Sequence, residues 1–149
     1  MAAPVLTPTI AMRTCLYYIY SGPDVYEKLQ REIDDYYDSK ALQEPITYQQ
    51  TQRLLYLVAV CKEAMRLLPS SVYQLIRYSP ERLSVIGKHI PAGTPVGVSL
   101  VCRNRDREAF GPDADEFGPE RWFDDEQKTR LMDTLNMTCG GWSQDVGGT

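Results

Sequence analysis

The residues best suited to chemistry in this sequence are its four cysteines and one pair of opposite charges. The cysteines, at positions 15, 61, 102 and 139, form no Cys-x-x-Cys motif and no closely spaced pair. This spacing argues against a zinc site and against a disulfide scaffold. Cys15 and Cys61 lie in apolar, helix-like patterns, where a cysteine is most simply a buried thiol. The cysteine usage fits a reducing, intracellular compartment.

The charge pair is Glu63 and Arg66, three residues apart near the end of an apolar run. On a helix such residues are neighbours, and an isolated surface pair stabilises the helix by only about 0.2–0.5 kcal/mol. The pair is therefore either a solvated ion pair or one half of a cluster that another charge completes. The run around it, residues 54–69, predicts a core helix. Its expected buried face consists of Leu54, Leu57, Val58, Cys61, Met65 and Leu68.

Two more helices are predicted before this one. Thr7 and Pro8 have the character of an N-cap and first-turn pair, opening a helix that continues to Tyr20 and ends at residues 21–23. Pro23 then opens an amphipathic helix whose charged residues, up to Asp38, are expected to face solvent. Its apolar stripe is Val25, Leu29, Ile33 and Tyr37. Further on, Thr47 and Gln50 predict a capping box.

Beyond Pro69 the pattern changes from helical spacing to short β runs. Residues 72–78, 83–86 and 94–101 are predicted to be strands, separated by turns rich in Pro and Gly. The chain is therefore predicted to be mainly α with a minor β component.

A second charged motif lies downstream and could supply the charge that completes a cluster with Glu63 and Arg66. Residues 117–122 read Phe-Gly-Pro-Glu-Arg-Trp, and residues 110–115 read Phe-Gly-Pro-Asp-Ala-Asp. Together with the pair, these motifs resemble the K helix and the meander of the cytochrome P-450 family, the haem-thiolate monooxygenases. The resemblance implies a structural triad of Glu63, Arg66 and Arg121. One carboxylate between two guanidiniums would pin a long irregular segment onto the helix.

The resemblance also implies a fold, namely the C-terminal part of the family domain, with the end of the I helix, the J and K helices, small sheets and the meander. Residues 1–149 are expected to form this partial domain, without the family's N-terminal part and L helix. The turn at residues 90–94 resembles the family's small-sheet hairpin, beside which His89 is expected to be a surface turn residue and not a ligand. Arg77 falls where members often place an arginine that pairs a haem propionate; an exposed strand residue is the alternative.

The first predicted helix resembles the C-terminal half of the I helix, whose Ala-Gly-x-Asp-Thr signature places an acid and an alcohol over the oxygen-binding side of the haem. Ala3 and Thr7 match this signature, but Pro4 replaces the glycine and Leu6 replaces the acid. Because leucine cannot carry a proton, the implied proton relay is incomplete. Thr7 is the catalytic candidate on this resemblance, and a helix cap is its alternative role.

The end of the chain aligns with the family's haem loop, Phe-x-x-Gly-x-Arg-x-Cys-x-Gly. Val146 stands at the place of the cysteine that ligates iron, Gln144 at the place of the propionate arginine, and Gly148 is the one retained glycine of the core motif. Valine has no lone pair for iron, and the thiolate is what drives cleavage of the oxygen–oxygen bond. Cys139 lies seven residues before Val146, so ligation by it would need another loop path; a simple thiol is its expected role.

Two functions follow from the resemblance. The first is haem-dependent oxidation of a small lipophilic, secondary-metabolite type of substrate, with electrons supplied by a reductase. The second is a truncated, non-catalytic relative or decaying gene product with a structural role only. The net charge of −4 gives no electrostatic footprint for nucleic acid. No signal peptide is recognised, and no apolar run reaches the ~18 residues needed for a membrane anchor.

Overall fold

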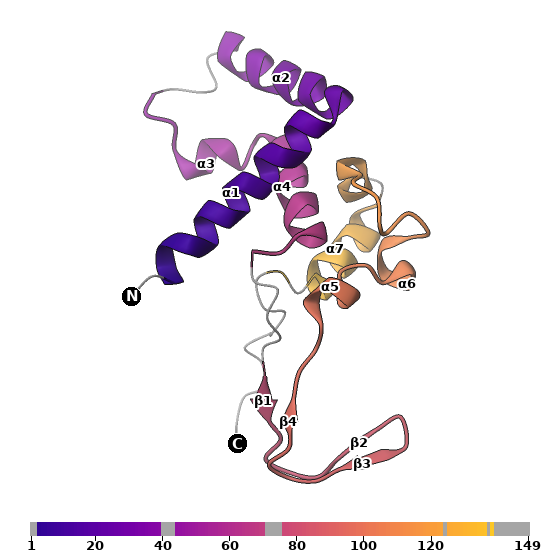
Figure 1. Ribbon diagram of the computed structural model, residues 1–149. Coiled ribbons are helices and arrows are strands. Elements are labelled where there is room, and N and C mark those ends of the chain that lie inside the picture. Colours follow the sequence, from indigo (N-terminus) through magenta and orange to yellow (C-terminus); the bar gives the residue numbers. More distant parts are fainter. Residues whose placement is uncertain (1–2, 40–43, 71–75, 124, 137, 139–149) are drawn as a thin grey trace.

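The computed structural model describes residues 3–39, 44–70, 76–123, 125–136 and 138, with residues 3–6 described by their backbone alone. Helices dominate, and two small antiparallel sheets lie at one end of the molecule (Figure 1). This confirms the predicted fold class. The helices are α1 (Ala3–Ser21), α2 (Pro23–Asp38), α3 (Tyr48–Thr51), α4 (Leu55–Leu67), α5 (Leu100–Arg103), α6 (Arg107–Phe110), the 3-10 helix η1 (Pro119–Trp122) and α7 (Glu126–Leu135).

Helix α1 begins earlier than the sequence pattern predicted. It starts at Ala3, so that Thr7 and Pro8 lie inside the helix and Thr7 is not its N-cap. The reason is that Pro4 occupies the first turn, where a missing N–H has no cost, and Pro8 removes only one further backbone hydrogen bond. The end of α1 at Ser21 and the start of α2 at Pro23 agree with the prediction.

Helix α2 packs against α1 and α4 through the first part of its predicted apolar stripe. Leu29 is buried and Val25 and Ile33 are half-buried, whereas Tyr37 is exposed. Glu32, expected to face solvent, instead accepts hydrogen bonds at Oε1 and Oε2 from the first-turn amides of α4, at 2.7 and 3.0 Å. The residue before α4 is Leu54, which has no capping oxygen, so α2 supplies the cap. The predicted capping box of Thr47 and Gln50 is present on α3.

Helix α4 is central to the fold, but its buried face is not the one that the apolar spacing predicted. Of the predicted face, Leu54 is buried, the next four members are half-buried and Leu68 is 45% exposed. The prediction failed because a charged pair can be enclosed when all its charges and hydrogen bonds are satisfied. The buried residues of α4 are Ala59, Val60, Glu63, Ala64, Arg66 and Leu67.

The two sheets are smaller than the predicted strands. β1 (Arg77–Tyr78) pairs with β4 (Pro95–Val96), and β2 (Leu83–Val85) pairs with β3 (Lys88–Ile90), both antiparallel. The predicted strand 94–101 stops early because Ser99 caps α5. The turn of the β2–β3 hairpin lies at Ile86 and Gly87, both with positive φ. The predicted turn at residues 90–94 is also present and follows β3, with the amide of Thr94 donating to the carbonyl of Pro91 at 3.3 Å. His89 lies on β3 and is exposed.

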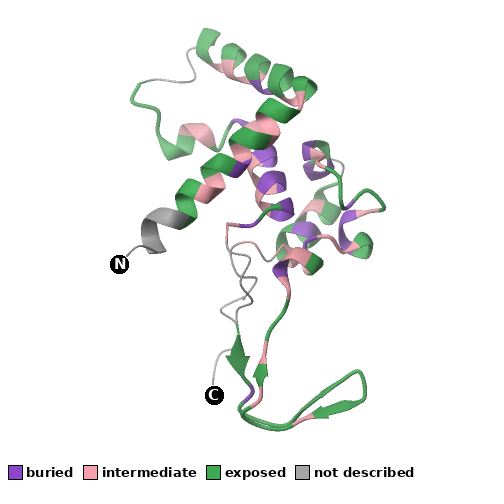
Figure 2. Cartoon of the chain, viewed as in Figure 1, coloured by how far each residue is buried: buried purple, intermediate pink, exposed green. Residues whose placement is uncertain are grey.

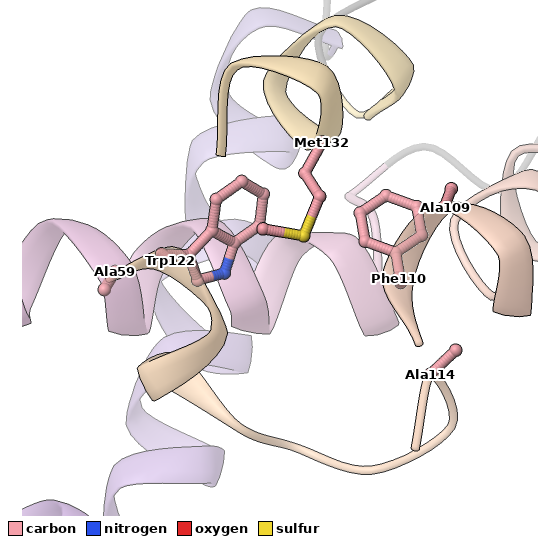
Figure 3. Close-up of a cluster of buried hydrophobic side chains, with 6 residues drawn as sticks. All are labelled: Ala59, Ala109, Phe110, Ala114, Trp122 and Met132. Atoms are coloured by element: carbon pink, nitrogen blue, oxygen red, sulfur yellow. The ribbon is translucent and has the colours of Figure 1, made fainter. Parts of the chain in front are cut away.

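The apolar core lies where α4, α6, η1 and α7 meet. In Figure 3 the side chain of Met132 on α7 reaches toward Trp122, with the ring of Phe110 on its other side. Figure 2 shows that burial is concentrated here, while the strands are mostly exposed. The core therefore holds α4 against the segment that follows the sheets. Its members are Ala59, Ala109, Phe110, Ala114, Trp122 and Met132.

Candidate functional site

A buried charge cluster joins α4 to residues 104–121, the irregular segment here called the meander. Glu63 and Arg66 come from the last two turns of α4, and Arg121 comes from η1. The side chains of Glu63 and Arg66 are 0% exposed and that of Arg121 is 5% exposed. The structure thus brings all three residues of the expected triad together, and it does so in the interior.

Glu63 is the centre of the cluster, and its carboxylate accepts five hydrogen bonds. Oε1 accepts from Nη2 of Arg66 at 2.8 Å, from Nε of Arg121 at 2.8 Å and from the amide of Gly118 at 3.1 Å. Oε2 accepts from Nε of Arg66 at 2.9 Å and from Nε1 of Trp122 at 3.1 Å. Such charge-assisted bonds replace the water that the carboxylate loses on burial.

Arg66 uses the rest of its guanidinium on backbone oxygens of the meander. Nη1 donates to the carbonyls of Asn104 and Ala114, each at 2.6 Å, and Nη2 also donates to the carbonyl of Glu116 at 3.2 Å. With the two bonds to Glu63, every N–H of Arg66 has a partner. A single side chain of α4 therefore ties three separate points of the meander to the helix.

Arg121 closes the cluster from the other side. Its Nη1 donates to the carbonyl of Phe110, and its Nη2 donates to the carbonyl of Asp113 at 3.1 Å and to Oδ2 of the same residue at 2.9 Å. Asp113 is half-exposed and brings a second carboxylate, so two acids face two guanidiniums and the formal charges balance. The hydrogen bond from Arg121 lowers the pKa of Asp113 below its ordinary value.

The cluster has the properties of a structural site and not of a reactive one. Among the described residues, no buried side-chain nitrogen or oxygen lacks a hydrogen-bond partner. Glu63 has no lone pair left facing a cavity, and the guanidiniums of Arg66 and Arg121 have no N–H directed at a space that a substrate would occupy. The cluster can hold the meander in place, but it offers no general base and no open ligand position.

The other predicted site residues lie elsewhere. Thr7 is in α1 and exposed, and Arg77 is on β1 and exposed, with Nη1 donating to the carbonyl of Ile76 at 3.1 Å. Neither belongs to the cluster. Leu6 lies in the backbone-only part of α1, and Cys139, Gln144, Val146 and Gly148 lie outside the described residues.

The sequence of this chain matches a known protein family over most of its length. The family model for cytochrome P-450 matches residues 1–135, which is most of the chain. The chain belongs to the cytochrome P-450 family. The match leaves residues 136–149, where the haem-loop alignment falls, outside it.

Curated relatives of this cytochrome P-450 chain come from fungi. It is 34% identical over 131 residues to cytochrome P-450 monooxygenase ACRTS1 of Alternaria alternata, covering 87% of this chain and 35% of the relative. It is 38% identical over 138 residues to a pisatin demethylase of Fusarium vanettenii, covering 92% and 26%. It is 35% identical over 126 residues to monooxygenase hepC of Aspergillus oryzae, covering 84% and 24%. The chain spans about a quarter to a third of the length of these relatives.

Membership of the cytochrome P-450 family implies haem, whose iron takes a cysteine thiolate as its ligand in this family. Three thiols are described: Cys102 is exposed on α5, and Cys15 on α1 and Cys61 on α4 are partly buried. No group of three or more His, Cys, Asp or Glu side chains in the described part could hold a metal ion. The hollow of about 510 Å³ beside His89 and Arg82 is an open surface of exposed hairpin residues. The residues that the family resemblance assigns to the haem loop, from Cys139 to Gly148, lie outside the described part of the chain.

The structure adds residues to the cluster that the sequence motifs did not reveal. Asp113, the indole of Trp122 and the amide of Gly118 all contact the triad. Asp113 and Trp122 belong to the two motifs, and their positions there could have indicated a place in the cluster. Asp113 is the second residue after Phe110-Gly111, and Trp122 directly follows Arg121. Asn104, fully buried, donates to the carbonyl of Arg66 at 3.2 Å and carried no such signal.

No helix in the described ranges combines the length and the apolar character that a bilayer crossing requires.

Proposed function

We propose that this chain carries the structural core of a cytochrome P-450 monooxygenase-family protein and that, as it stands, it does not form a haem-thiolate centre. The family assignment and the buried cluster support the first part. The second part rests on the sequence resemblance that aligns Val146 with the ligand cysteine of the family's haem loop, in a stretch that the family match leaves out. The proposed role of Glu63, Arg66 and Arg121 is to fix the meander on α4.

Three substitutions support the loss of the haem chemistry, each at a different step. Val146 replaces the cysteine that ligates iron, and Gln144 replaces the arginine that pairs a propionate. Leu6 replaces the acid of the proton relay. Thr7 and Arg77 are the remaining residues proposed to lie toward a haem, and Gly148 is the remaining loop glycine. Because the losses are independent, we propose that restoring one of them does not restore turnover.

The second candidate is haem-dependent oxidation of a small lipophilic substrate with electrons from a reductase. It is favoured by the names of the relatives, which include several monooxygenases and a pisatin demethylase. Pisatin is the substrate that this relative's name states, and a lipophilic secondary metabolite is the corresponding substrate class here. On this candidate Cys139 would have to replace the missing ligand.

The test is to load the purified chain with haemin, reduce it under carbon monoxide, and record the strongly red-shifted Soret band that thiolate ligation gives. We expect no such band in the unchanged chain. The matched variants are Val146→Cys with Gln144→Arg, which restores the ligand and the propionate cation, and Cys139→Ser. A band in the unchanged chain that Cys139→Ser abolishes would overturn the proposal and favour the second candidate.

A further inference from the structure

The β2–β3 hairpin projects from the molecule and ends in an apolar tip. Figure 1 shows this hairpin extending away from the helices, beyond the ribbon that β1 and β4 form. At its tip Ile86 is 97% exposed, and Val85 before it is 47% exposed. A Cβ placed on Gly87, the other turn residue, would meet no atom within 4 Å. Within the described part of the chain, nothing therefore covers the tip.

The backbone of Ile86 is as unusual as its exposure. Its φ is 50°, and that of Gly87 is 71°. A two-residue hairpin turn with positive φ at both positions favours Asn or Asp followed by Gly. A β-branched residue is a genuine outlier in this region of φ. Ile86 thus combines a strained backbone with a fully hydrated apolar side chain, and asparagine at this position would avoid both.

The base of the hairpin is held in place, so the direction of the tip is fixed. The amide of Gly93 donates to the carbonyl of Ser79 at 2.7 Å, and the amide of Ser79 donates to the carbonyl of Thr94 at 3.2 Å. Ser79 itself is buried. The hairpin is therefore presented on a braced base and not on an open loop.

The register of the two strands collects the apolar side chains on one face. Leu83 lies opposite Ile90, and Val85 lies opposite Lys88. Residues directly opposite each other, and residues two apart along a strand, share a face of the ribbon. One face of the hairpin therefore carries Leu83, Val85, Ile90 and the stem of Lys88, next to Ile86 in the turn.

The hairpin region is positively charged, although the whole chain is acidic. Between residues 76 and 98 there are three cations, Arg77, Arg82 and Lys88, and one acid, Glu81. This region carries +2 within a chain of net charge −4, so the rest of the chain carries −6. Arg82 and Lys88 flank the apolar tip and are exposed. Their long stems let each charge stay in a polar layer while neighbouring apolar side chains lie deeper.

We propose that the β2–β3 hairpin docks on the surface of an anionic lipid bilayer. Ile86 and Val85 enter the boundary between head groups and acyl chains, and Arg82 and Lys88 contact anionic head groups. The charges are complementary, and a fluid bilayer accepts a narrow apolar tip without the matching groove that a protein partner would need. The contact is peripheral, and neither the charge cluster nor any haem chemistry takes part in it.

The experiment is flotation of the purified chain with two kinds of vesicle. One kind is phosphatidylcholine alone, and the other is phosphatidylcholine and phosphatidylserine in equal amounts. We expect clear binding to the anionic vesicles and weaker binding to the neutral ones. Ile86→Asn should lower the partition coefficient on anionic vesicles about tenfold or more, because the apolar side chain that is buried is lost.

Substitution of a cation should act on the anionic vesicles alone. Lys88→Gln should weaken binding to phosphatidylserine vesicles about fivefold and leave binding to neutral vesicles unchanged. Arg31→Gln, which removes an exposed cation from α2, is the matched control and should bind as the unchanged chain. Added salt should reduce the same electrostatic part of the binding.

Two further measurements separate docking from loss of fold. Because asparagine suits positive φ, Ile86→Asn should melt at the temperature of the unchanged chain or above it. In Ile86→Trp, lipids brominated along the acyl chain should quench the introduced indole, with the signal of Trp122 and Trp142 taken from the unchanged chain. Leu131→Trp on α7, where Leu131 is 52% exposed, is the control and should not be quenched.

Three outcomes would overturn the proposal. The first is a chain that stays unbound with anionic vesicles, and the second is equal binding by Ile86→Asn and the unchanged chain. The third is a lipid-free result: sedimentation velocity in which Ile86→Asn abolishes self-association, with vesicle binding unaffected, would identify a second copy of this chain as the occupant of the tip.

Discussion

Arg121 donates from Nε to Oε1 of Glu63 at 2.8 Å, across 58 residues of chain. The two side chains are 5% and 0% exposed, so water contributes almost nothing to their solvation. The contact is therefore part of a closed arrangement in which each group depends on the others. Removing one member leaves buried charge without its full set of partners, so the fold is expected to be sensitive to substitution in this cluster.

The first prediction concerns that sensitivity. Glu63→Ala should lower the free energy of unfolding by about 3–5 kcal/mol, because two guanidiniums lose the carboxylate that offsets their burial. Urea unfolding followed by circular dichroism measures this loss. The matched control is Glu126→Ala, which removes a carboxylate paired with Arg130 on the surface, with both side chains about 80% exposed. That control should unfold within about 0.5 kcal/mol of the unchanged chain. Equal stability of all three proteins would refute the structural role of the cluster.

The residues of the cluster were foreseeable from the sequence, but the face of α4 that it buries was not. The Glu-x-x-Arg and Pro-Glu-Arg motifs predicted that Glu63, Arg66 and Arg121 would meet. The spacing of apolar residues, however, predicted that the opposite side of the helix would be enclosed. Hydrophobic periodicity assumes that charged residues face water. That assumption fails here because backbone carbonyls of the meander accept hydrogen bonds from the buried guanidiniums. The positions of these carbonyls cannot be predicted from the sequence.

Local signals predicted helix ends better than they predicted strands. Ser21 to Pro23 marked the break between α1 and α2, and Thr47 with Gln50 marked the cap of α3, because these devices act over three or four residues. The strands depend on pairing between distant segments, such as Arg77 with Val96. Short β runs cannot specify such partners by themselves.

The second prediction concerns the cap that α2 provides for α4. Glu32→Ala should lower the free energy of unfolding by about 0.5–2 kcal/mol, because two first-turn amides of α4 lose their acceptor and the helix dipole loses a favourable charge. Glu27→Ala on the same helix is the control, since Glu27 pairs with Arg31 on the exposed surface of the helix. A Glu32→Ala chain as stable as Glu27→Ala would show that the cap contributes nothing measurable.

The third prediction concerns acid stability. The pKa of Asp113 is lowered in the folded chain by Arg121, so Asp113 stabilises the fold above its unfolded pKa, and this contribution is lost as the pH falls through the folded value. The unchanged chain should therefore be more stable than Asp113→Asn at pH 6. The difference should shrink as the pH is lowered below about 4, the ordinary range of an aspartate. A difference that is constant from pH 6 to pH 3 would exclude this linkage; guanidinium unfolding at fixed pH values measures it.

The fourth prediction concerns association of the isolated chain. Leu16 and Tyr20 on α1 are 53% and 73% exposed, and Leu55 on α4 is 60% exposed. Apolar surface of this kind promotes self-association, as do the open edges of two-stranded sheets. Sedimentation velocity should show larger species as protein concentration rises, and Leu16→Lys with Leu55→Lys should reduce them. A monodisperse, cooperatively unfolding monomer over the whole concentration range would contradict the expectation.

The last prediction concerns the ionisation of the Cys15 thiol, whose pKa is lowered by the thiol of Cys61. In the reduced chain, the rate at which iodoacetamide alkylates Cys15 should rise with pH with a midpoint of about 7, because alkylation follows the thiolate fraction and the Cys61 thiol lowers the pKa of Cys15. Cys61→Ala removes the donor and leaves the burial, so the midpoint should move up toward the ordinary 9.0 or beyond. Cys102→Ser should leave it unchanged. Peptide mass spectrometry of residues 14–28 over a pH series gives the midpoint in each protein. A midpoint that stays the same in Cys61→Ala would mean that another group lowers the pKa of Cys15.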